Sequence, residues 1–144
     1  MVEFMLVIFL LLIVFVSILQ MILFMHAYNT LADAAKEGVR YAIVHGTQNI
    51  NCSGPLSSTI CTTPDTSPYA NVQAAVTNFA AVSFQNITAS NVSVAYGPRI
   101  AGGANCNNPG CSVRVTVSHA YNPLFGLGWP SFTIYAAAAG RIMN

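Results

Sequence analysis

The sequence predicts an α+β protein: a long N-terminal helix followed by a small head with one helix and a three-stranded antiparallel sheet. Three observations predict this fold. An apolar run extends from Phe4 to Met25, broken only by Ser17 and Gln20; segments with helical periodicity follow it; and short alternating segments occur after residue 90. We expect two parts: residues 1–46, an N-terminal apolar helix, and residues 47–144, a globular head.

The apolar run and the segment after it predict one continuous helix from about Val2 to His45. The run alone would rise about 33 Å as a helix, enough to cross the hydrocarbon layer. Beyond it, apolar residues recur at helical spacing, at Tyr28, Leu31, Ala35 and Val39. The first half is apolar all round and must be enclosed on every side, whereas the second half can carry the head on one side.

The middle of the chain predicts a loop and then a second helix. Residues 47–68 are rich in Ser, Thr and Pro and show no periodicity, which is typical of a surface loop. Ser67 followed by Pro68 is a helix start signal, a cap and then a proline in the first turn. The helix should cover residues 69–84, and its packed face comprises Val72, Ala75, Val76, Phe79 and Ala80.

Three segments near the C-terminus predict strands. They are residues 92–96, residues 112–121 and the last segment from Phe132. The middle one alternates strictly, with Val113, Val115, Val117 and His119 on one face. The segments are joined by a hairpin tip, "GGANCNNPGC", and a connecting loop, "NPLFGLGWPS". Strands in this order beside helices predict an antiparallel meander.

Four cysteines lie after the apolar run. An even count in a small, loop-rich, exported region indicates disulfides. We favour Cys52–Cys61 and Cys106–Cys111, because each pair closes a short loop. A zinc site is the competing interpretation, but it lacks a C-x-x-C knuckle and flanking histidine ligands.

The composition limits the classes of function. Charged residues make up 6% of the chain and the net charge is +1, which argues against nucleic acid as a partner. Such a sparse charge complement predicts a surface that packs against copies of itself, is glycosylated, or both. Asn51, Asn86 and Asn91 fit the N-x-[ST] pattern of glycosylation, and the Ser/Thr/Pro-rich loop at 57–68 is a candidate for O-glycans.

No motif in the sequence predicts an enzyme. The candidates would be His26, His45 and His119, but nothing places a nucleophile near a base, and G-x-S-x-G, H-E-x-x-H and a phosphate-binding Gly-rich loop are missing. We expect no catalytic residue, no cofactor and no metal.

Glu3 is the feature that a plain membrane anchor leaves unexplained. A signal peptide is not indicated, because no Lys or Arg precedes Lys36 and no A-x-A site follows the run. A single-pass anchor fits the length but accounts neither for an acid at its tip nor for the missing basic flank. Removal of a basic leader just before this sequence would account for both.

Two segments, "MVEFMLVIFLLL" and "YNTLADAAKEGVRYAIVHG", resemble the TadE-like family of pilins and pseudopilins. Val2, Glu3 and Phe4 match the family's opening Val-Glu-Phe. The second element matches at Ala34, Ala35, Glu37, Gly38, Arg40, Tyr41 and Ala42, with Lys36 replacing an arginine. The C-terminal segments "VRVTVSHAYNPLFGLG" and "FTIYAAAAGRIMN" also look like the family's last two strands. Phe9 stands where the family commonly has proline, and Glu3 is third where its glutamate is usually fifth after cleavage.

The resemblance implies a mechanism of assembly. Such subunits wait in the cytoplasmic membrane, are processed by a prepilin peptidase, and are extracted by the inner-membrane assembly machinery into a helical homopolymer. Glu3 would pair with the N-terminal amine of an adjacent subunit, at Met1 in this numbering, and so set the axial register. The filament core would then be packed by Phe4, Leu6, Phe9, Leu10, Ile13, Phe15, Leu19 and Ile22.

We therefore expect a structural subunit of an extracellular, Tad-type pilus-like filament. One alternative is a minor pseudopilin that primes or caps a Tad pilus made chiefly of another subunit. Another is a single-pass envelope protein whose head binds a ligand. Lipid before assembly and copies of the same chain afterwards would be the main partners.

Overall fold

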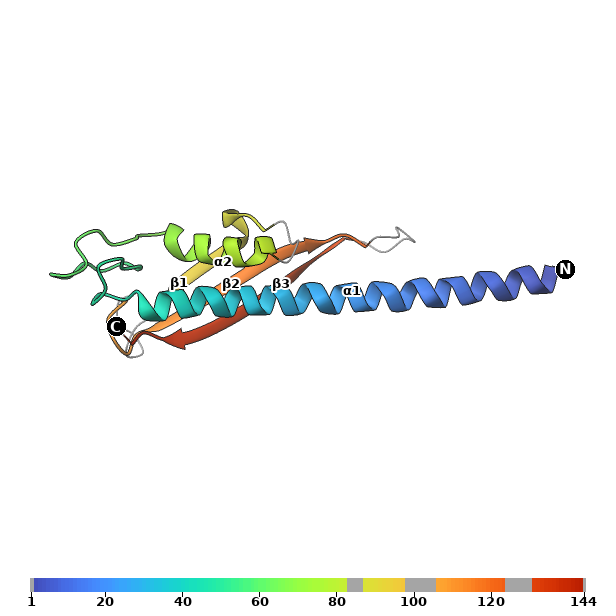
Figure 1. Cartoon of the computed structure of the whole chain (residues 1–144), viewed down its shortest axis with the longest axis horizontal. Helices are drawn as coiled ribbons and strands as arrows, with labels where there is room; N and C mark the ends of the chain where they lie inside the picture. The colour runs from blue at the N-terminus through green and yellow to red at the C-terminus, as the bar shows by residue number, and fades with distance from the viewer. Residues whose placement is uncertain (1, 83–86, 98–105, 124–130, 144) are drawn as a thin grey trace.

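A long helix and a short sheet run side by side in the structure, a computed structural model that describes residues 2–82, 87–97, 106–123 and 131–143. The elements are α1 (Val2–Val44), α2 (Ala70–Val82), a single 3₁₀ turn η1 (Ala89–Asn91), β1 (Val92–Tyr96), β2 (Ser112–Tyr121) and β3 (Phe132–Arg141). The C-terminal half of α1 lies along the sheet and its N-terminal half projects beyond it (Figure 1). The predicted α+β fold is confirmed.

The sheet is an antiparallel meander of order β1-β2-β3. In the register of the sheet, Val115 of β2 pairs with Val94 of β1 on one side and with Ala138 of β3 on the other. The alternation read from β2 sets its faces: Val113, Val115 and Val117 are fully buried. The last strand ends at Arg141, and the final residue lies outside the described residues.

Small residues let α1 approach the sheet closely. The buried face of its second half includes Ala27, Ala34, Ala35, Gly38 and Ala42. Opposite it, β3 presents alanines and then Gly140, where an added Cβ would come within 2.7 Å of Val39 Cγ1 and 2.6 Å of Ile43 Cδ1. The run of alanines in β3 is therefore the counterpart of the alanine-rich face of α1.

Helix α2 packs beside α1 on the same face of the sheet, but the prediction that Phe79 is a core residue is wrong. Phe79 is 38% exposed, and Gln73 is buried in its place. The face that meets the sheet is centred on Val72, Val76 and Ala80, one turn apart. Gln73 lies next to this row, and its Nε2 donates to the Val92 carbonyl at 3.0 Å, so the buried amide is satisfied.

The predicted cap of α2 is also wrong. The helix begins at Ala70, after Ser67 and Pro68. The carboxylate of Asp65 accepts from the backbone N–H groups of Ala70, at 3.2 Å, and Asn71, at 2.8 Å. Asp65 thus satisfies two of the first N–H groups of the helix and places a negative charge at its positive end. The predicted continuation to residue 84 lies outside the described residues.

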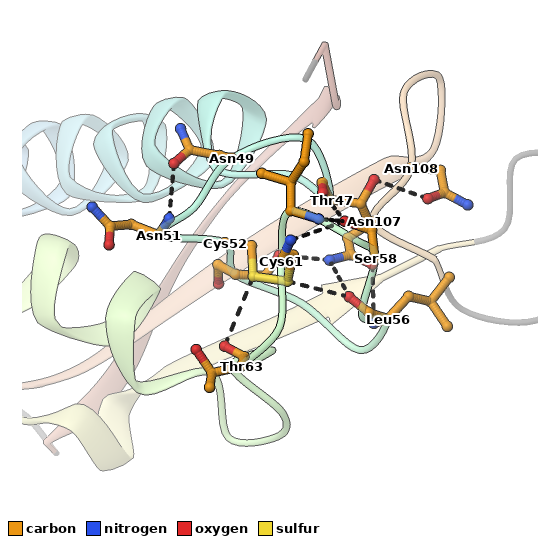
Figure 2. Close-up of a disulfide and its surroundings, with 12 residues drawn as sticks. Thr47, Asn49, Asn51, Cys52, Leu56, Ser58, Cys61, Thr63, Asn107 and Asn108 are labelled. Carbon is orange, nitrogen blue, oxygen red and sulfur yellow. Dashed lines mark hydrogen bonds between the residues drawn. A yellow bond between two sulfur atoms is a disulfide. The ribbon is translucent and has the colours of Figure 1, made fainter.

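Two disulfides and one buried amide hold the loops at the far end of the head. Cys52–Cys61 and Cys106–Cys111 are bonded, which are the two pairings favoured above. Asn107 is fully buried and links the two disulfide-bonded loops through hydrogen bonds (Figure 2). Its Nδ2 donates to the Ser53 and Leu56 carbonyls, and its Oδ1 accepts from the Leu56 N–H at 3.0 Å.

Candidate assembly surface

The first part of α1 is an uncovered apolar rod. Every residue from Val2 to Phe15, which we call the stalk, is exposed. Six of the predicted core-packing residues lie in the stalk and are between 38% and 70% exposed: Phe4, Leu6, Phe9, Leu10, Ile13 and Phe15. Figure 1 shows this segment projecting past the sheet. Water is a poor solvent for such a surface, so the stalk requires lipid or protein around it.

The head reaches further down α1 than the sequence predicted. Val16 and Gln20 are buried, whereas Leu19 and Ile22 on other sides of the helix remain exposed. The Tyr121 hydroxyl donates to the Gln20 carbonyl at 3.3 Å. The expectation that the whole apolar half needs enclosure on every side is therefore wrong beyond Phe15, because one side of the helix is already buried at Val16 and Gln20.

Three aromatic rings pack together where α1 passes the end of β2 and the start of β3. The Phe24 ring lies 5.8 Å from that of Tyr121 in an edge-to-face arrangement and 5.7 Å from that of Phe132, centroid to centroid. Tyr121 and Phe132, paired across β2 and β3, are 5.5 Å apart. Such contacts contribute beyond simple area burial. We call these three residues the base of the head.

Glu3 lies in the first turn of α1 and is exposed. It is the only ionisable residue of the stalk, and the next one along the helix is His26. The charged pairs of α1 come later, Asp33–Lys36 at 2.9 Å and Glu37–Arg40 at 3.6 Å, and both are exposed. Met1, the predicted site of the amine partner, lies outside the described residues, and the pairing of Glu3 stays a prediction.

The histidines do not gather into one site. His26 and His119 line a hollow of about 320 Å³ and mixed polarity with Asn122, next to the base of the head. His45 lies at the other end of α1, where its ring stacks on Tyr41 and its Nδ1 is 2.8 Å from the Tyr41 carbonyl oxygen. No group of three His, Cys, Asp or Glu side chains that could hold a metal occurs within the described ranges.

A tyrosine cluster stabilises the far end of the head. The hydroxyl of Tyr96 donates to Ser53 Oγ at 3.1 Å, and its ring lies 4.8 Å from that of Tyr69. Burial, partly opposed by the Ser53 hydrogen bond, raises the pKa of Tyr96 to about 12. Burial and then the nearby Asp65 charge also raise the pKa of Tyr69. The cluster is therefore neutral at physiological pH and serves packing.

The asparagines of the glycosylation sequons differ in exposure and in the hydrogen bonds of their side chains. Asn51 is exposed, and its backbone N–H donates to Asn49 Oδ1 at 2.9 Å. Asn91 uses its side-chain oxygen to accept from the N–H and hydroxyl of Thr88, at 3.1 Å and 2.7 Å. Asn86 lies outside the described residues. Glycosylation of any of the three stays a prediction.

Fold and surface together define a class of protein: a small α+β head carried on the second half of a long helix whose first half is bare and apolar. Within the described residues, α1 is the one helix whose length and composition would allow it to cross a membrane.

Residues 1–40 match the model of a family described as TadE-like protein. The resemblance read from the sequence is thus confirmed over this segment, which covers the stalk and most of α1. The resemblance of the C-terminal strands lies outside the match and stays a prediction. No curated protein and no solved structure matched the chain. The family match and the apolar helix fit a protein related to the Tad pilus and anchored in a membrane.

Sequence reasoning missed two residues that shape this surface, Gln20 and Tyr121. Gln20 and Ser17, as the only polar residues of the apolar run, were the available signal that one side of that run faces protein. Nothing local indicated that Tyr121 lies beside Gln20, since the two are 101 residues apart in the chain.

Proposed function

We propose that this chain is a structural subunit of an extracellular Tad-type filament, held together by packing of the stalks and without catalytic activity of its own. Before assembly it spans the cytoplasmic membrane through α1. Its partners there are the prepilin peptidase and the inner-membrane assembly machinery, and its partners in the filament are copies of itself.

The observation that carries this proposal is the stalk, exposed on all sides. Burying a Leu, Ile, Val, Phe or Met side chain fully stabilises by roughly 1.5–3 kcal/mol. Outside a membrane, other stalks offer the matching apolar surface. The exposed ion pairs of α1 offer much less, at about 0–1 kcal/mol each.

The head supports the same role in a second way. It packs on α1 through small residues from Ala27 to Ala42. Packing of stalks would then place the heads on the outside of a filament in a regular array. The two disulfides and Asn107 keep the outermost loops ordered there.

The test is negative-stain imaging of material sheared from the cell surface, with mass spectrometry of any fibres. We expect this chain to be their main component. If fibres contained it only in trace amounts, the role as main subunit would be wrong and that of a minor pseudopilin that primes or caps the pilus would replace it. If it stayed with the cell envelope and no fibre contained it, a single-pass protein with a ligand-binding head would be the remaining candidate.

A further inference from the structure

The base of the head shows an apolar hollow beside its three rings. The hollow, of about 410 Å³, lies between α1 and the ends of β2 and β3, and its lining includes Met21, Phe24, Tyr121, Pro123 and Phe132. Phe132 is 41% exposed and Met21 is 62% exposed. An apolar hollow with exposed rims on an otherwise charge-poor head indicates contact with an apolar partner.

The distance along α1 places this hollow at a defined depth if the helix spans a bilayer. Phe24 lies 21 positions after Glu3, the ionisable residue at the other end of the apolar segment. At 1.5 Å per residue the two are about 32 Å apart, close to the roughly 30 Å thickness of the hydrocarbon layer. With Glu3 at one boundary, the base of the head therefore lies at the other.

The polarity of the surface changes at the same level. The hollow that contains Phe24 and Phe132 is lined almost entirely by apolar groups. The neighbouring hollow towards the head contains His26, His119 and Asn122. Tyr121 belongs to both. One of the three rings is a tyrosine, whose hydroxyl donates to the Gln20 carbonyl. An apolar hollow on one side of this ring and hydrogen-bonding side chains on the other match the boundary between acyl chains and headgroups.

We propose that the base of the head is a lipid-contact surface: before assembly Phe24, Tyr121 and Phe132 lie in the outer interfacial layer, and the hollow beside them takes phospholipid acyl chains. The head then sits against the bilayer in a fixed orientation. This inference rests on the membrane-anchored stage of the proposed function and does not require that a filament forms.

Depth-dependent quenching of a single tryptophan tests this proposal. The full-length chain, with its only tryptophan replaced (Trp129→Phe), receives one reporter at the base, Phe132→Trp, and is reconstituted into phosphatidylcholine–phosphatidylglycerol vesicles with brominated acyl chains. We expect loss of emission when the bromines are near the headgroup end, less loss when they are near the bilayer centre, and little quenching by aqueous acrylamide.

Two further variants make the outcome decisive. Phe24→Trp, in the same background, puts the reporter on the helix side of the ring cluster and should report the same depth. Tyr135→Trp is the matched control: Tyr135 is 65% exposed and points to the opposite face of the sheet, so acrylamide should quench it and bromolipid should not.

Quenching of the residue-132 and residue-24 reporters by acrylamide alone would show that the base lies in water and would overturn the proposal. Protection from both quenchers, lost when the protein is diluted within the vesicles, would show that a second copy of the chain fills the hollow, and would also overturn it. Failure to find fibres on cells would leave the result with vesicles unaffected.

Discussion

Glu3 is the residue on which ordered assembly should depend. In the proposed filament an acid enclosed by apolar helices would be costly unless a positive group neutralised it, and the N-terminal amine of an adjacent subunit would be its partner. We predict that Glu3→Gln and Glu3→Ala leave the protein in the membrane but sharply reduce filament yield, measured from sheared cell material and membrane fractions. Glu37→Gln, which alters an exposed ion pair, is the control and should assemble normally. A normal yield from Glu3→Ala would remove the register role.

Asn107 should contribute more to the stability of the head than any other polar residue of its loops. Its amide satisfies two carbonyls and one N–H of the 53–56 segment. Asn107→Ala leaves these groups without their partner, so we predict a loss of about 2–3 kcal/mol in the free energy of unfolding. Denaturant unfolding of the purified chain measures it. Asn108→Ala, which removes one acceptor for Thr47 on an exposed residue, should cost at most about 1 kcal/mol. Equal losses from the two variants would contradict the role of Asn107.

Tyr96 predicts how stability changes in alkaline solution. Its pKa is raised to about 12 in the folded chain, against an ordinary value of 10.0. The unfolded chain therefore releases this proton at a lower pH than the folded chain does. The stabilisation of the fold by protonated Tyr96 is fully present below pH 10 and is lost as the pH rises towards 12. Tyr96→Phe should make the fall in stability between pH 10 and 12 shallower, by up to about 1.4 kcal/mol per pH unit. Unfolding midpoints measured across this pH range for both chains would test it, and parallel curves would count against it.

At the scale of elements, α1, α2 and β2 meet in a close contact at Gly38. An added Cβ on Gly38 would lie 2.5 Å from Val76 Cγ2 and 3.2 Å from Val115 Cγ1. Both valines are fully buried and stiff. We predict that Gly38→Ala destabilises the head by about 1–3 kcal/mol through overpacking, although alanine is the better helix former.

The double variant Gly38→Ala, Val76→Ala provides the matched test. The added methyl would occupy part of the space that the valine leaves, so the combined loss should be smaller than the sum of the two single losses. Unfolding free energies of the four chains measure this coupling. Additive losses would show that the two helices can separate to accommodate the methyl group.

At the scale of the whole molecule, the filament should resist salt and yield to detergent. Its stability would come from apolar stalks, whereas the chain has only five basic and four acidic residues to form ion pairs. Salt screens charges but does not weaken apolar burial. We predict that fibres still sediment in molar sodium chloride and dissolve in detergents that compete for apolar surface. Fibres that dissolve in molar salt would show that contacts between heads carry the assembly.

The structure also determines which N-terminal truncation tests whether the stalks carry the assembly. Removing residues 1–25 would delete Phe24 and the Gln20 carbonyl and so expose the partner rings on β2 and β3. A chain that begins at Val16 loses the stalk but keeps these contacts. It should fold and fail to form fibres, and sedimentation would detect either outcome.

The sequence by itself determined the elements that depend on local spacing. The length of α1, the alternation of Val113, Val115 and Val117, and the two short disulfide loops follow from patterns within a few neighbouring residues, because helical and strand periodicity and loop closure are local properties. The TadE-like resemblance also lay in contiguous residues, which is why a family match could confirm it over residues 1–40.

Only the tertiary structure decided which distant segments meet. Gln73 rather than Phe79 is buried because β1 offers its amide a carbonyl acceptor, and Asp65 caps α2 because the chain turns back between the two. Likewise, the bare stalk ends at Phe15 because Val16 and Gln20 are buried on one side of α1, and further along the helix the rings of β2 and β3 contact Phe24. Burial and hydrogen-bond satisfaction depend on the partner as much as on the residue. The local pattern therefore predicted the helix, and the arrangement of the sheet decided how much of it remains free to contact lipid or another subunit.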